Sequence, residues 1–144
     1  MGAPMNPNGL TVLLVEDDDR DAILIRKAFS ELGLEDDLRR VGSPDEAIAA
    51  LSSETPASPL PSLILVNLGL SRKSDFKILR WMRKQKTAVR RIPFIILAAS
   101  RQPPGFEQAY DLGAVSYLVK PLDRDALLSM IKAVIDFWKL DGRR

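Results

Sequence analysis

Ser62-Leu63-Ile64-Leu65-Val66-Asn67 is an apolar run that ends in an amide. Four consecutive aliphatic residues are typical of a strand that is buried on both faces, as strands in a parallel sheet are. Apolar runs recur at intervals along the chain, and residues 37–41 show a weaker strand pattern. The sequence therefore predicts five strands, over residues 10–15, 37–41, 62–66, 92–98 and 116–119.

Helical patterns separate these strands. Asp18 or Asp19 can cap a helix that Gly33 ends. Ser43-Pro44-Asp45-Glu46 is a capping box with proline at the first helical position, and it begins a second helix. The remaining helices are predicted over residues 74–86, 104–112 and 123–140. Strand and helix alternate five times, which predicts an α/β fold with right-handed crossovers and a parallel sheet covered by helices on both faces.

The composition is that of one globular domain. The chain has 144 residues, of which 46% are hydrophobic and 28% are charged, and its longest apolar runs are too short to span a membrane. Residues 1–9 are rich in proline, asparagine and glycine and lack an apolar signal core. We expect a disordered leader over residues 1–9, a single domain over residues 10–144, and a cytoplasmic location.

Two absent residue types exclude whole classes of chemistry. The chain contains no cysteine and no histidine. It therefore has no disulfide framework, no thiolate or imidazole metal site, and no histidine general base. A net charge of +2 does not indicate a general nucleic-acid-binding surface. Residues 72–91 hold nine lysines and arginines and one acidic residue, and we interpret them as a solvated helix face rather than a specific nucleic-acid site.

Polar residues follow several of the predicted strands. Glu16 and Asp17 follow the first strand, Asn67 ends the third, Ala98 ends the fourth, and Lys120 follows the fifth. In open parallel sheets, binding sites lie beyond the carboxyl ends of the strands, at the point where the strand order reverses. The sequence therefore predicts that these residues share one site.

Three stretches resemble the response-regulator receiver domain when their order and spacing are taken together. They read VLLVEDD at residues 12–18, LILVN at 63–67 and GAVSYLVKP at 113–121. The resemblance covers about residues 10–140 and implies a flavodoxin-like, doubly wound (β/α)5 sheet with strand order 2-1-3-4-5. Residues 72–74, 109–113 and 137–138 are similar to the single-domain regulators that partner bacterial phytochrome-type histidine kinases.

The resemblance also implies a role for each site residue. In the family, an acidic pair and an acceptor aspartate hold Mg²⁺, a hydroxyl on the fourth strand binds phosphate, and a lysine contacts it. Transferred to this chain, the metal ligands are Glu16, Asp17 and the Gly69 carbonyl, the acceptor position is Asn67, and the phosphate-contact positions are Ala98 and Lys120.

Two of these positions depart from the family pattern. Asn67 carries an amide, a poor nucleophile that cannot form an acyl phosphate. Ala98 has no hydroxyl, and a shift of one residue would place Ala99 there instead, which also lacks one; Ser100 would require a shift of two. Ser71 and Asp75 are further departures, at positions where proline and glycine are common in the family.

Loss of the acceptor carboxylate also weakens the field that attracts a cation. Two carboxylates then face one lysine, and Lys120 can pair with Asp17 or Glu16 without a metal. We expect a pocket that is collapsed or that binds Mg²⁺ only weakly, with no other cofactor.

The fifth strand and the last helix suggest a dimer surface. The resemblance makes Tyr117 a switch aromatic, and the last helix carries apolar residues on two sides. We expect a homodimer through Ile131, Ile135 and Trp138; the alternative is that Tyr117 and Trp138 are half-buried packing residues.

These expectations favour a non-phosphorylatable receiver, a protein-interaction module with no catalytic activity. Its partner would be a histidine kinase, in particular one of the phytochrome type, or another response regulator. One alternative is a phospho-accepting regulator whose acceptor aspartate was replaced by Asn67. Another is a flavodoxin-like domain that binds a small anion through Lys120 and the backbone amides after the third strand.

Overall fold

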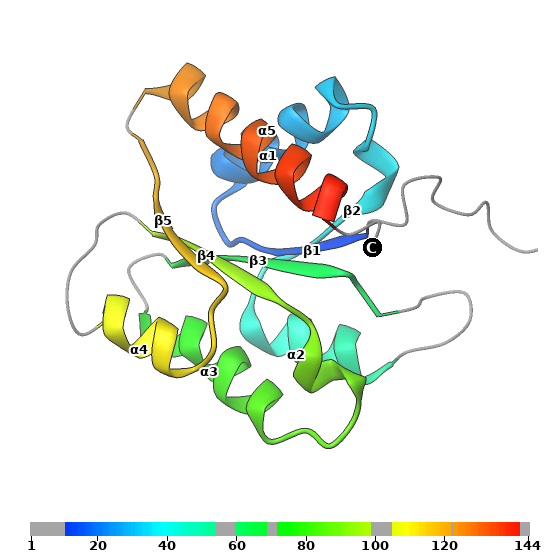
Figure 1. Cartoon of the computed structure of the whole chain (residues 1–144), viewed down its shortest axis with the longest axis vertical. Coiled ribbons are helices and arrows are strands. Elements are labelled where there is room, and N and C mark those ends of the chain that lie inside the picture. The colour runs from blue at the N-terminus through cyan, green and yellow to red at the C-terminus, as the bar shows by residue number, and fades with distance from the viewer. Residues whose placement is uncertain (1–10, 54–59, 69–71, 99–104, 122, 142–144) are drawn as a thin grey trace, which may run out of the picture.

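The computed structural model describes residues 11–53, 60–68, 72–98, 105–121 and 123–141. The predicted leader over residues 1–9 lies outside the described residues. Figure 1 shows one sheet with helices on both of its faces. In the described part of the chain, no helix combines the length and the apolar composition that a membrane span requires.

Five parallel strands form the sheet, in the order β2-β1-β3-β4-β5. Their bounds are β1 Val12–Val15, β2 Leu38–Val41, β3 Leu63–Leu68, β4 Phe94–Ala98 and β5 Ser116–Val119. The predicted fold class and strand order are therefore confirmed. The third strand is longer than expected, because Asn67 and Leu68 continue to pair with Leu97 and Ala98 of β4.

The helices connect successive strands. They are α1 Asp19–Glu31, α2 Pro44–Ser52, α3 Arg72–Arg83, α4 Gly105–Asp111 and α5 Arg124–Asp141, together with the 3₁₀ helices η1 Glu35–Asp37 and η2 Ala88–Arg91. Figure 1 shows α1 and α5 on one face of the sheet and α2, α3 and α4 on the other. The predicted bounds differ most at α3, which was expected over residues 74–86 and spans Arg72–Arg83. The fourth strand begins at Phe94 rather than at residue 92, after η2.

The sheet separates two hydrophobic clusters. Leu13 and Val15 of β1 pack on the side of α2 and α3, whereas Val12 and Leu14 pack on the side of α1 and α5. Successive side chains of a strand point to opposite faces, so a continuous apolar strand supplies both clusters. Each fully buried aliphatic side chain contributes about 1.5–3 kcal/mol to stability.

Side-chain caps fix the beginnings of the helices. The Asp18 carboxylate accepts hydrogen bonds from the backbone N–H groups of Arg20 and Asp21, and these bonds lower the pKa of Asp18. At the start of α2, Ser43 Oγ accepts from Glu46 N at 3.1 Å, as the capping box predicts. The Glu46 carboxylate accepts a hydrogen bond from Gly42 N at 2.9 Å. In a standard capping box this carboxylate would accept from the N–H of the N-cap residue, Ser43, which is the next residue along the chain.

Ser43→Ala should lower the free energy of unfolding by about 1 kcal/mol, because the Glu46 N–H loses its cap. Urea denaturation measures this loss. Ser52→Ala is the matched control, since the Ser52 hydroxyl only donates to Ile48 O within the last turn of α2. Equal stability of the Ser43→Ala variant and the wild type would show that this cap does not determine where α2 begins.

Candidate functional site

Parallel pairing brings the ends of four strands to one edge of the sheet. Val15 pairs with Val66, so the next residues, Glu16 and Asn67, lie at adjacent positions. On the other side, Lys120 N donates to Ala98 O at 2.7 Å. The structure thus places Glu16, Asn67, Ala98 and Lys120 along the same edge, as the sequence predicts.

A buried hydrogen bond between Asn67 and Glu16 lies at the centre of this edge. Asn67 is 5% exposed and Glu16 is 1% exposed, and Asn67 Nδ2 donates to Glu16 Oε2. The backbone N–H of Asp18 also donates to Glu16 Oε2, at 3.2 Å. One oxygen of each side chain, Glu16 Oε1 and Asn67 Oδ1, is buried without a hydrogen-bond partner. The amide thus contacts the carboxylate directly.

Burial dominates the electrostatics of Glu16. Removal from water raises the pKa of this carboxyl group, because the charged form loses its hydration. Hydrogen bonds from Asn67 and from Asp18 N and the charge of Lys120 lower the pKa, but they only partly offset burial. Glu16 therefore retains its proton to a higher pH than an exposed glutamate does.

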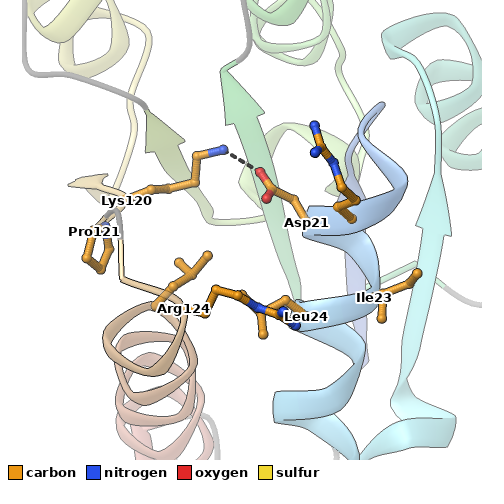
Figure 2. Close-up of a pocket in the computed structure, with 8 residues that line it drawn as sticks. Asp21, Ile23, Leu24, Lys120, Pro121 and Arg124 are labelled. Atoms are coloured by element: carbon orange, nitrogen blue, oxygen red, sulfur yellow. Dashed lines mark hydrogen bonds and ion pairs between the residues drawn. The ribbon is translucent and has the colours of Figure 1, made fainter.

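Lys120 makes a different ion pair from the one that the sequence predicts. Its Nζ lies 2.7 Å from Asp21 Oδ2, in the first turn of α1, and this pair is drawn in Figure 2. The sequence predicts an ion pair of Lys120 with Asp17 or Glu16. In the structure the Asp17 side chain is exposed, and the Glu16 carboxyl group is hydrogen-bonded to Asn67. The predicted pairing is therefore wrong. Sequence reasoning missed Asp21 because only the packing of α1 beside the end of β5 reveals the contact.

The described residues fit a tightly held Mg²⁺ poorly. The unpartnered oxygens of Glu16 and Asn67 could accept a cation, but Asn67 directs an N–H donor toward the same carboxylate. Mg²⁺ requires a nearly octahedral set of oxygen ligands. No group of three or more acidic, histidine or cysteine side chains that could hold a metal occurs within the described ranges. The Gly69 carbonyl, the third predicted ligand, lies outside them.

Ala98 and Tyr117 are both buried, in the same hydrophobic cluster on the α3 face of the sheet. Ala98 is the last residue of β4, which is the strand end predicted for it from the sequence. It pairs with Val119 of β5, the residue directly before Lys120. The alternatives Ala99 and Ser100 lie outside the described residues, as does Ser71. Nothing is described of the side chain of Asp75.

Two of the residues predicted to form a dimer surface belong to the core. Ile131 is 1% exposed and Ile135 is 0% exposed, and both pack against the sheet and α1. The assignment of these two residues to a contact surface is therefore wrong, since they lie on the stripe of α5 that faces inward. The side chain of Trp138 lies outside the described residues, and its neighbour Phe137 is 68% exposed.

Glu16→Gln should make stability less dependent on pH. The pKa of Glu16 is raised in the folded chain from an ordinary value of 4.5, so the unfolded chain loses this proton first as the pH rises. The wild type therefore loses stability from the ordinary pKa up to the raised one. Above that range, the free energy of unfolding of the glutamine variant should exceed that of the wild type, because the variant has no buried carboxyl group to ionise.

Urea denaturation at several pH values measures this difference, which should shrink toward acidic pH. Asp17→Asn is the control, because it removes the neighbouring carboxylate, which is exposed and makes no part of the buried Asn67–Glu16 hydrogen bond. A glutamine variant that is less stable than the wild type at every pH would show that the buried carboxylate is needed in its charged form.

Comparison with known proteins gives the same family for nearly the whole chain. The family model described as the response regulator receiver domain matches residues 12–132. Response regulator Rcp1 of Synechocystis sp. (strain ATCC 27184 / PCC 6803 / Kazusa) is 30% identical over 129 residues, which cover 88% of this chain and 87% of Rcp1.

Solved structures agree with the sequence comparison. The phosphorylated cyanobacterial phytochrome response regulator RcpA superposes with a TM-score of 0.79 at 27% identity, covering 90% of this chain and 93% of RcpA. The Mn²⁺-bound form of Rcp1 superposes with a TM-score of 0.76 at 27% identity, covering 90% and 94%. The chain therefore belongs to the response regulator receiver domain family, and its relatives include phytochrome-associated response regulators.

Proposed function

We propose that this chain is a receiver domain that signals without accepting a phosphoryl group. The observation that carries the proposal is Asn67 at the acceptor position, buried and hydrogen-bonded to Glu16. Formation of an acyl phosphate requires a carboxylate oxygen that attacks phosphorus. The amide oxygen is a much weaker nucleophile, because the lone pair of its nitrogen is delocalised into the carbonyl and no negative charge is available.

The surroundings of Asn67 support the same proposal. A phosphoryl group at this position would lack a hydroxyl partner from Ala98. Lys120, the cation that would contact it, is paired with Asp21. Mg²⁺ binding at this site is proposed to be weak, because one of the two expected side-chain ligands is exposed and the other accepts hydrogen bonds from Asn67 and Asp18 N.

Protein contact is the output that remains for such a domain. We propose that the chain is not a catalyst and that it binds a histidine kinase or another response regulator in two-component signalling. Relatives whose names refer to phytochrome signalling favour a phytochrome-type kinase as the partner. The contact would then form whether or not a phosphoryl donor is present.

The unmodified chain should acquire no covalent phosphate from acetyl phosphate or from a cognate kinase, as measured by intact-protein mass spectrometry. Its affinity for the kinase should be the same with and without the phosphoryl donor. Asn67→Asp restores the nucleophile and is the comparison variant; labelling of this variant alone would assign the loss of phosphorylation to residue 67. A stable phosphate on the unmodified chain would refute the proposal.

We also propose a homodimer that uses exposed apolar side chains in and around β5 and α5. The predicted residues Ile131 and Ile135 are buried and cannot form it, but other apolar side chains of these two elements and of the residue before β5 are exposed. They are Val115 just before β5, Val119 on β5 and Phe137 on α5. β5 is an edge strand, so a second copy can approach it without disrupting the sheet.

Light scattering at about 50 µM should give the mass of a dimer, since a stable interface of standard size survives at this concentration. Val119→Lys and Phe137→Lys should each shift the mass toward the monomer. Ile23→Lys is the matched control, because Ile23 is as exposed as Phe137 but lies on α1 rather than on β5 or α5. A monomeric wild type would contradict the dimer and leave the phosphorylation result unaffected.

A further inference from the structure

A hollow between α1 and the start of α5 has no role in the function proposed above. Its volume is about 630 Å³, within the range of small-molecule sites. It is lined from one side by the first turns of α1 and from the other by Lys120, Pro121 and the beginning of α5. Figure 2 shows Arg124 extending from α5 toward Leu24 on α1.

The charges that line the hollow are predominantly positive. Arg20, Lys120 and Arg124 face one carboxylate, that of Asp21. Lys120 already pairs with this carboxylate at 2.7 Å. Arg20 is 93% exposed and lies 3.8 Å from its nearest partner, Asp18, and Arg124 makes no ion pair with any residue that the structure describes. Two arginines are thus available to a ligand, and both favour an anionic one.

The rest of the lining is aliphatic. Leu24 and Leu127 form buried parts of the wall, and Pro121 and Ile23 complete it. No aromatic side chain occurs among the described residues that line the hollow, so nothing there offers a stacking surface to a nucleobase or a flavin. The lining therefore favours an aliphatic body over a planar aromatic one.

We propose that this hollow binds a small organic anion, with a carboxylate or phosphate head between Arg20, Lys120 and Arg124 and an aliphatic body against Leu24, Leu127 and Pro121. The head competes with Asp21 for Lys120. This site shares Lys120 with the strand ends but does not include Asn67, since the ligand lies between α1 and α5 and makes no covalent bond. The proposal does not depend on whether the chain accepts phosphate.

Octanoate is a suitable probe, because it carries a single carboxylate on a straight aliphatic chain. Titration followed by amide chemical shifts should show saturable binding with one molecule per chain, and the shifts should be largest in the first turns of α1 and α5. Octanol lacks the charge and acetate lacks the body. Each should bind at least about tenfold more weakly than octanoate, because each loses one of the two contributions.

Variants of the lining separate specific binding from general attraction to a basic protein. Arg20→Gln and Arg124→Gln should each weaken octanoate binding by about fivefold, the effect of one partly exposed ion pair. Arg26→Gln is the matched control, because Arg26 is exposed on α1 but does not line the hollow. Asp21→Asn should strengthen binding, since it releases Lys120 from its present partner.

Three results would overturn the proposal. The first is the absence of saturable octanoate binding up to about 10 mM. The second is an equal loss of affinity in the Arg26→Gln control. The third is binding only to vesicles of phosphatidylglycerol, which would indicate a membrane surface rather than an enclosed ligand. All of these measurements omit a phosphoryl donor, so their failure is distinct from a failure of the function proposed above.

Discussion

The hydrogen bond from Asn67 to Glu16 is the interaction on which the character of this receiver depends. Both side chains are almost fully removed from water. The Asn67 amide donates to the Glu16 carboxyl group, whose pKa is raised by burial. An aspartate at residue 67 would place two buried carboxylates side by side, an arrangement that requires a cation or a shared proton. The amide removes that requirement, because it donates a hydrogen bond to the carboxylate instead.

Lys120 is the cation at the same strand ends. Its ammonium group pairs with Asp21 on α1, and the pair joins the end of β5 to the first helix. This contact brings Lys120 to the rim of the hollow between α1 and α5. The residue that contacts phosphate in other receivers is thus held where a different anion can reach it.

Sequence and structure agree best where local patterns are strong. Continuous aliphatic runs predicted the buried strands β1, β3 and β4, and the capping box at Ser43 predicted the start of α2. The dimer surface was predicted poorly, because helix α5 carries apolar residues on more than one side. Its periodicity alone does not show that Ile131 and Ile135 face the sheet while Phe137 faces outward.

The chain's own residues determined the alternation of strand and helix, the edge of the sheet at which the site lies, and the amide in place of a carboxylate at the end of β3. These are properties of side-chain type and of spacing along one segment. Tertiary structure alone decided that Glu16 would be buried, that Asp21 rather than Asp17 would pair with Lys120, and that a hollow would lie beside Arg124. Each of these depends on how segments about 50 to 100 residues apart pack together, and local periodicity carries no information about such distances.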